Sequence, residues 1–177
     1  MKYYLLTELE RVKTPDIQNY NQVIHYRAFE EDKAYEMNKR TVCVVNNDAD
    51  FGDILFRPFP LFSERAKEAL DLFLWDSTYR EIDFLTHDRS ASFHYYLPFF
   101  WRTPGTCSIN EASRGIKTAE VILSHAIPED IPAIYLNTGT TLLMIARLDL
   151  MESLLRKGVC SVQMYPVSLR LRGGFHE

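Results

Sequence analysis

Apolar residues follow strand spacing over much of this chain. Short runs of β-branched, aromatic and aliphatic residues recur, and turn-forming residues end most of them. These runs predict strands at residues 2–6, 41–45, 53–56, 82–85, 92–97, 119–123, 133–136 and 159–165. Two segments with helical spacing interrupt the series, so the pattern predicts an α+β fold. Cys43 and Cys160 lie on two of the predicted strands, where we expect both thiols in the core.

The first helical segment follows Ser63, which stands where a helix N-cap belongs. Glu64 comes next, in the first turn, where a carboxylate interacts favourably with the helix dipole. The apolar residues then recur at the spacing of one helix face: Ala66, Ala69, Leu70, Phe73 and Leu74. We therefore predict a helix that begins at Glu64 and buries this face.

The second helical segment has an apolar face made by Leu148, Met151, Leu154 and Leu155. Arg156 and Lys157 lie in its last turn, where positive charge complements the helix dipole. Gly158 follows, in position for the left-handed conformation that ends many helices. The pattern predicts a helix that begins near Ile145, without an N-cap hydroxyl, and ends before Gly158.

Residues 54–85 and 134–167 repeat one order of elements, which is strand, loop, helix, strand. One helix on two strands cannot bury its apolar face alone, so a duplicated unit needs a partner. We predict a single α+β domain over residues 1–177, with a mostly antiparallel sheet, two principal helices and a degenerate duplicated strand-helix-strand unit. Chance recurrence of a common unit is the alternative to duplication. Residues 98–117 are predicted to form the longest irregular connection.

The composition excludes several classes of protein. With 46% hydrophobic residues and a net charge of −4, the 177-residue chain is too apolar for intrinsic disorder. Its 20 basic residues do not outnumber its 24 acidic ones, which disfavours general binding to nucleic acid. The chain contains no run of about 18 apolar residues, so we predict no membrane-spanning helix. The three cysteines are odd in number and widely spaced, which indicates a reducing compartment, so we predict a cytoplasmic protein.

Motif spacing identifies no metal, cofactor or catalytic site. Residues 46–53 contain oxygen ligands, but Phe51 and Arg57 stand where a calcium-binding loop needs glycine and glutamate. The five histidines lack the spacings of zinc motifs, and no glycine-rich nucleotide-binding motif is present. We therefore predict no metal, no cofactor and no catalytic residues. The alternative is a small enzyme with a site assembled from distant residues, for which the candidates are His94, His125, Asp88 and Ser124.

Two kinds of segment are candidates for a partner surface, one aromatic and one acidic. The candidate residues are Phe99, Phe100, Trp101 and Arg102 in the aromatic segment, and Glu30, Glu31, Asp32, Asp48 and Asp50 in two acidic runs. The aromatic segment follows Pro98, so we predict a loop there, and Trp and Arg anchor many interfaces. The acidic runs would attract a basic partner by charge. The alternatives are core packing for the aromatic residues and a solvated face for the acidic ones.

Several short motifs of the chain occur together in a known family. They are Asp53–Phe56, Leu61–Arg65 with Ala69 and Leu70 in the following helix, Ile82–Leu85, Tyr95–Leu97, and the later Gly158 with Tyr165–Val167. In these motifs the chain resembles the bacterial immunity family numbered eleven of the polymorphic-toxin systems, formerly a domain of unknown function. The resemblance covers roughly residues 53–167. It implies a non-catalytic cytoplasmic protein that binds a cognate toxin and blocks it, and it brings no catalytic residues.

The leading hypothesis is therefore a non-catalytic protein that neutralises a cognate bacterial toxin through protein–protein binding. This hypothesis includes no cofactor, no nucleic acid and no membrane partner. One alternative is the small enzyme with distant His, Asp and Ser residues. Another is a component of a homo-oligomeric scaffold that associates through Phe99–Arg102. The oligomeric state is left open, with a homodimer among the alternatives.

Overall fold

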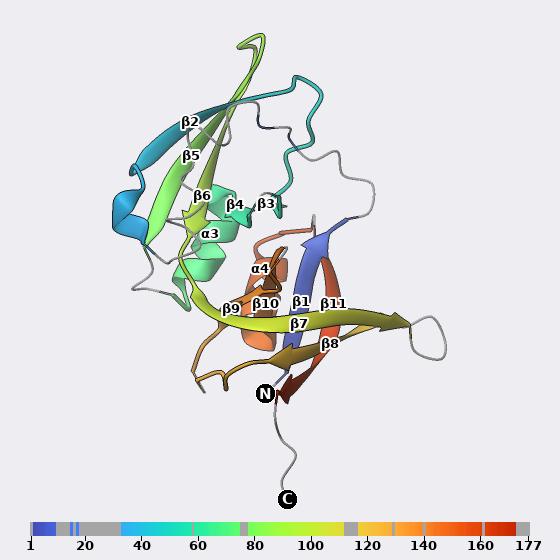
Figure 1. Ribbon diagram of the computed structural model, residues 1–177. Coiled ribbons are helices and arrows are strands. Elements are labelled where there is room, and N and C mark those ends of the chain that lie inside the picture. The colour runs from blue at the N-terminus through green and yellow to red at the C-terminus, as the bar shows by residue number, and fades with distance from the viewer. Residues whose placement is uncertain are drawn as a thin grey trace, which may run out of the picture. The chain divides into compact units, whose positions relative to one another are not determined.

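The chain forms two compact units, one with an open sheet and one with a closed barrel (Figure 1). The computed structural model describes residues 2–9, 15, 17, 33–57, 59–74, 78–111, 117–128, 130–139, 141–160 and 162–172. The barrel unit comprises Met1–Thr7, Phe100–Gly158 and Val162–Glu177. The sheet unit comprises Glu8–Phe99 and Val159–Ser161. The prediction of one domain for the whole chain stays a prediction.

Within its described residues, the sheet unit contains a five-stranded sheet and two short helices. Its elements are η1 (Ala34–Glu36), a 3-10 helix, the strands β2 (Arg40–Val45), β3 (Ile54–Leu55), β4 (Leu61–Phe62), β5 (Tyr79–Thr86) and β6 (Ser92–Pro98), and the α-helix α3 (Glu64–Asp71). The strand order is β2-β5-β6-β4-β3. Strands β2 and β5 run parallel, and the other neighbours run antiparallel.

Helix α3 confirms the predicted start and face. The Oγ atom of Ser63 accepts a hydrogen bond from the amide of Ala66 at 3.3 Å, which caps the helix. Ala66, Ala69 and Leu70 are fully buried. The helix ends at Asp71, so the predicted face extends past its C-terminus, where Phe73 and Leu74 are half-buried.

The part of the barrel unit that the structure describes has six strands and one α-helix. They are β1 (Tyr3–Glu8), β7 (Trp101–Glu111), β8 (Lys117–Leu123), β9 (Ala133–Asn137), β10 (Leu142–Arg147), α4 (Leu148–Arg156) and β11 (Val162–Leu171). The strands form a closed barrel in the order β1-β10-β9-β7-β8-β11. Two neighbouring pairs, β7 with β9 and β8 with β11, are parallel. Most of the pairings are antiparallel, as predicted, but the sheet closes into a barrel, which the prediction of a simple sheet did not include. A hairpin and a helix connect β8 to β11 as the crossover that a parallel pair needs.

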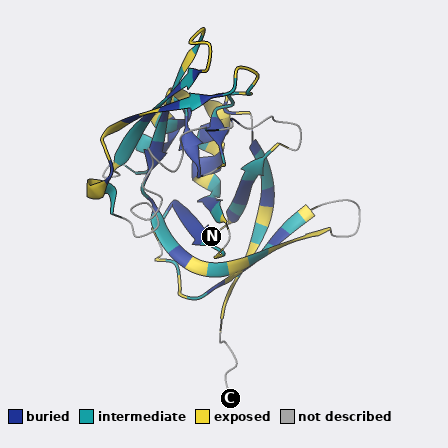
Figure 2. Ribbon diagram, turned by 45° about the horizontal axis from the view of Figure 1, so that its top comes forward, coloured by how far each residue is buried: buried dark blue, intermediate teal, exposed yellow. Residues whose placement is uncertain are grey.

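The barrel interior is filled by alternate residues of its strands, as the period of two requires. Along β8, for example, Ala119, Val121 and Leu123 are buried while Ile122 is 38% exposed. The buried residues that form this core, dark blue in Figure 2, are Tyr3, Leu5, Ala119, Val121, Leu123, Ile134, Leu136, Ile145 and Tyr165. Trp101, Cys107 and Leu169 are among the half-buried residues that pack against them.

Strand β7 corrects the prediction of an irregular connection over residues 98–117. Residues Trp101–Glu111 form this strand, and Pro104 and Gly105 lie inside it although both residue types are common in loops. A Cβ atom on Gly105 would lie 2.5 Å from the carbonyl oxygen of Ile122 and 2.6 Å from Cδ1 of Leu136. The strand therefore needs glycine here because its neighbour approaches so closely.

Helix α4 begins later than predicted. Ile145 and Ala146 belong to β10, and the helix starts at Leu148 without a side-chain cap. Gly158 has a φ of 81°, which confirms the predicted left-handed end. Leu155 was expected on the buried face but is 49% exposed. Within the described residues, no helix combines the length and the apolar character needed to cross a membrane.

Candidate functional site

One side of the five-stranded sheet and one flank of α3 together hold a connected group of charged and aromatic side chains. Along β5, Ile82 and Phe84 are buried on one side of the sheet, so Tyr79, Glu81 and Asp83 share the other side. Register then places Asp83 beside His94 of β6. The group, which we call the α3 face, consists of Arg40, Tyr79, Glu81, Asp83, His94 and Tyr96 on the strands and Glu64, Lys67 and Asp71 on the helix.

Asp83 lies at the centre of the strand part of the α3 face. Its Oδ1 atom is 2.7 Å from Nδ1 of His94, and its Oδ2 atom accepts a hydrogen bond from Nε of Arg40. The hydrogen bond from Arg40 holds the pKa of Asp83 below its usual value, and the bond to His94 acts in the same direction. The Asp83 side chain is only 18% exposed, whereas that of Arg40 is 64% exposed. A half-buried carboxylate thus orients two side chains that reach solvent.

Two tyrosines join the strands to α3. The hydroxyl of Tyr79 donates to Oδ1 of Asp71 at 2.8 Å, and the hydroxyl of Tyr96 donates to Oε2 of Glu64. Burial raises the pKa of Tyr96 to about 12, and the neighbouring Glu64 carboxylate adds to the shift. Burial and the bond to Asp71 likewise raise the pKa of Tyr79. Both phenols therefore remain protonated and act as donors at neutral pH.

Lys67 and His94 make the α3 face continuous. The Nζ atom of Lys67 lies 4.8 Å from the ring centroid of Tyr79 and 5.2 Å from that of Tyr96, within range of a cation–π interaction. The same atom is 2.6 Å from Oδ2 of Asp71. The ring of His94 meets that of Tyr96 edge-on, with centroids 4.7 Å apart. Each side chain is thus held by at least one neighbour.

An apolar strip adjoins the α3 face on β2 and β5. Val42 pairs with Asp83, and Val44 pairs with Leu85, in the parallel register of these strands. Val42 is 51% exposed, and Val44 and Leu85 are half-buried. Exposed aliphatic side chains beside oriented charges resemble the centre and rim of a protein interface.

The α3 face has features of two kinds of site. His94 is bonded to Asp83, which is how a carboxylate orients an imidazole for acid–base chemistry. Its other ring nitrogen, Nε2, lies 4.0 Å from Oε2 of Glu81, so both ring nitrogens face carboxylates. Two pockets lie in the barrel unit, and their linings contain no residue of the α3 face. Within the described residues, no group of His, Cys, Asp and Glu could hold a metal ion.

The predicted aromatic loop is only partly a loop, because Phe99 and Phe100 connect β6 to β7 whereas Trp101 and Arg102 belong to β7. Phe100 is 3% exposed, and its ring centroid lies 4.7 Å from that of Tyr135. Trp101 and Arg102 are half-buried at the start of β7, and Cζ of Arg102 lies 5.7 Å from the Tyr135 ring. Phe99 is half-buried and its amide donates to Thr78. Trp101 and Arg102 belong to the barrel sheet because β7 pairs with both β8 and β9. The Phe100 ring is buried and offers no exposed surface to a partner.

The predicted acidic residues fall in two places. Glu30, Glu31 and Asp32 lie outside the described residues. Asp48 and Asp50 are exposed in the connection between β2 and β3, where Nδ2 of Asn46 donates to Oδ1 of Asp48 at 2.5 Å. Their acidic side chains are accessible, as a role in charge steering requires.

The candidates for an enzyme site belong to different units. Asp88 and His94 lie in the sheet unit, whereas Ser124 and His125 lie in the barrel unit. Asp88 bonds Ser90, whose hydroxyl donates to Oδ1 at 2.8 Å and whose amide donates at 3.0 Å. These bonds hold the pKa of Asp88 below its usual value. The carboxylate that His94 meets is Asp83, which sequence reasoning missed.

The comparisons with known proteins give no match. No protein-family model matches the chain, and neither the search of curated proteins nor the search of solved structures found a similar one.

Proposed function

We propose that this protein is a non-catalytic binding protein that neutralises a cognate bacterial toxin, and that the α3 face is its binding surface. The observation that carries the proposal is the pre-organised state of that face, where Asp83 orients Arg40 and His94 while Lys67 lies between two tyrosine rings. The resemblance to an immunity family supplies the kind of partner.

Pre-organisation favours binding because a partner then orders few additional side chains. Tyrosine and arginine are frequent anchors of protein interfaces, and the exposed Val42 adds an apolar contact beside them.

Charge indicates the chemistry of the partner. The α3 face has four carboxylates against Arg40 and Lys67, and the exposed Asp48 and Asp50 lie in the same unit. A basic toxin surface would be complementary to this excess, which would raise the association rate.

The proposal includes a cytoplasmic location. Cys43, Cys107 and Cys160 are all free thiols, as expected in a reducing compartment.

The His94–Asp83 pair favours one alternative, an enzyme that inactivates the toxin chemically. The 2.7 Å contact would orient His94 as a general base. The two functions differ in stoichiometry, because a binding protein neutralises about one toxin per chain whereas an enzyme neutralises an excess. Titration of toxin activity against this protein therefore separates them, and neutralisation far below equimolar ratio would contradict the binding proposal.

The direct test is co-expression with the toxin encoded beside this gene, followed by affinity measurement on the purified pair. Glu81 is 46% exposed, and Glu81→Lys should weaken the complex about tenfold by reversing one charge of the α3 face. The matched control is Glu152→Lys on α4, where Glu152 is 50% exposed, and it should leave affinity within about twofold. Failure of the wild type to protect growth or form a complex would refute the function. Equal affinities for both variants would refute the surface.

A further inference from the structure

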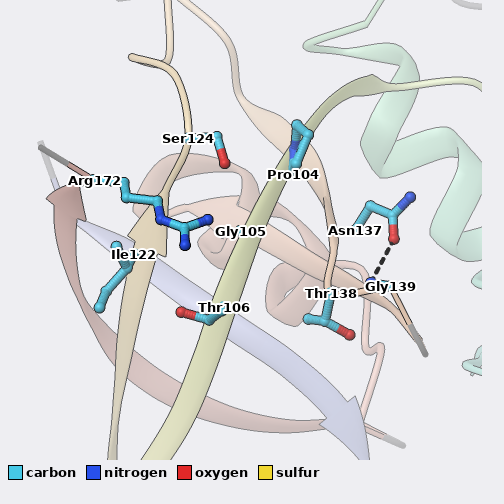
Figure 3. Close-up of a pocket in the computed structure, with 9 residues that line it drawn as sticks. All are labelled: Pro104, Gly105, Thr106, Ile122, Ser124, Asn137, Thr138, Gly139 and Arg172. Carbon is cyan, nitrogen blue, oxygen red and sulfur yellow. Dashed lines mark hydrogen bonds between the residues drawn. The ribbon is translucent and has the colours of Figure 1, made fainter.

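The barrel unit has a pocket of about 570 Å³ on the outer side of its strands (Figure 3). Its lining residues come from β7, from the end of β8, from the turn after β9 and from the residue after β11. They are Pro104, Gly105, Thr106, Ile122, Ser124, Asn137, Thr138, Gly139 and Arg172. A volume of this size suits an organic molecule rather than a single water or ion.

Hydrogen bonds fix the walls of this pocket. The amide of Ser124 donates to the carbonyl of Pro104 at 3.0 Å, and the amide of Arg172 donates to that of Leu123 at 2.7 Å. In the turn after β9, Oδ1 of Asn137 accepts from the amide of Gly139 at 2.8 Å. Gly139 has a φ of 86°, which glycine adopts without strain. The pocket is therefore built on strand ends and an ordered turn.

The chemistry of the lining is cationic and rich in hydroxyl groups. Arg172 is the charged residue of the lining, which has no Asp or Glu. In Figure 3 its guanidinium points towards Gly105, with the hydroxyls of Ser124 and Thr106 on either side in this view. Pro104 and Ile122 add apolar surface.

Arg172 differs from most described arginines in its lack of a carboxylate neighbour. Those that form ion pairs within the described residues are Arg40, Arg57, Arg65, Arg147, Arg156 and Arg170. No carboxylate among the described residues lies within ion-pair distance of Arg172. Its five N–H donors are thus available for an external anion, which a guanidinium can bind through two parallel hydrogen bonds.

We propose that this pocket binds a small organic anion through a phosphate or carboxylate group. The anionic group meets Arg172 and the hydroxyls of Ser124 and Thr106, and an apolar part of the ligand lies against Ile122 and Pro104. The site lies wholly in the barrel unit, so it is independent of toxin binding by the α3 face.

Calorimetric titration of the full chain with phenyl phosphate and with benzoate tests the proposal. At least one probe should bind saturably at one site per chain, and phenyl phosphate should bind more tightly than inorganic phosphate because its ring adds apolar contact. Arg172→Gln should weaken binding at least tenfold. Arg172→Lys should lose part of the affinity, because lysine keeps the positive charge but cannot donate two parallel hydrogen bonds to the anion. Arg156→Gln is the matched control, since Arg156 is 80% exposed on α4, and should bind as the wild type does.

Thr106→Asp gives a second variant that leaves Arg172 in place. Thr106 is exposed, so the substitution should fold, and the new carboxylate would both repel the probe and pair with Arg172. Circular dichroism confirms that each variant is folded before titration. The proposal is overturned when neither probe binds the wild type saturably below about 10 mM. Equal affinities of the wild type, Arg172→Gln and Thr106→Asp would overturn it too.

Discussion

The open sheet and the closed barrel share an arrangement of five strands. In the sheet unit the order is β3-β4-β6-β5-β2, and in the barrel unit the run β9-β10-β1-β11-β8 has the same sequence of directions. Each run has an antiparallel hairpin at one end and a parallel pair at the other. The antiparallel relation of β1 and β11 follows from the other pairings around the barrel.

The helices occupy equivalent positions in the two runs. Helix α3 lies between β4 and β5 in the chain, and α4 lies between β10 and β11. Each helix begins within two residues of the hairpin strand that precedes it. This shared order supports the predicted duplication more strongly than the degenerate sequence repeat does.

Two differences separate the units. The strand between β10 and β11 is β1, which precedes the repeat in the chain, whereas the equivalent β6 follows its repeat. The barrel also has β7, which pairs with β8 on one side and β9 on the other. Strands equivalent to these two are the edges of the open sheet. One additional strand therefore distinguishes a closed barrel from an open sheet.

The largest expected effect comes from a substitution that breaks barrel closure. Gly105→Val should destabilise the barrel unit by about 3 kcal/mol or more, because the new side chain would collide with the backbone of β8. Hydrogen exchange of the β7 and β8 amides measures the loss. Protection in β5 and β6 should change little if closure is a property of the barrel alone. Unchanged protection in β7 would show that β8 can move aside.

A smaller effect is expected from the N-cap of α3. Of α3 and α4, only α3 has a side-chain cap. Ser63→Ala removes the bond to the amide of Ala66 and a 2.9 Å bond to Oδ1 of Asp53. We expect a loss of about 1–2 kcal/mol in the stability of the sheet unit. Denaturant dependence of amide exchange in β5 and β6 measures it. Arg147→Ala, at the N-cap position of α4, is the control and should cost less, and an equal cost would contradict the distinction.

The smallest effect concerns the pH dependence that Asp83 gives the sheet unit. Its folded pKa lies below the unfolded value of 3.8, chiefly because Arg40 donates to it. Its stabilising contribution is therefore present above pH 3.8 and decreases as the pH falls towards the lower folded pKa. Asp83→Asn should reduce stability at pH 7, and its difference from wild type should shrink in acid. A difference that stayed constant between pH 7 and pH 3 would contradict the role of the ionised carboxylate. Asp149→Asn gives the parallel measurement for the Arg147–Asp149 pair of the barrel unit.

The correct predictions from sequence depend on residues that are neighbours in the chain. The start of α3 depends on Ser63 and on neighbouring helical spacing, and the predicted cap is confirmed. Strand β7 depends instead on pairing with β8 and β9, which are distant in sequence, while its Pro104 and Gly105 resemble loop residues. Cys43 is fully buried as predicted, but Cys160 is exposed because β11 begins only at Val162.

The candidate site was less accessible to prediction. The predicted strands at 82–85 and 92–97 are close in the chain, and the short turn between them sets the hairpin register that pairs Asp83 with His94, so the sequence contained a signal for this contact. The contacts of Tyr79 and Tyr96 with α3 were not, because they depend on how the helix lies across the strands. The pocket of Arg172 likewise needs strand ends that are remote in the chain to meet.

The position of β1 has a consequence for biosynthesis. Tyr3 pairs with Arg147 and Leu6 pairs with Met144, so β1 is made well over one hundred residues before β10, the strand it pairs with. The sheet unit is nearly complete when residue 99 has been added, whereas β11 ends at Leu171. At ordinary rates of synthesis, β1 stays without β10 and β11 for roughly 10–30 s. Over that interval Leu5 and Leu6, both buried in the finished barrel, are exposed to chaperones or to aggregation.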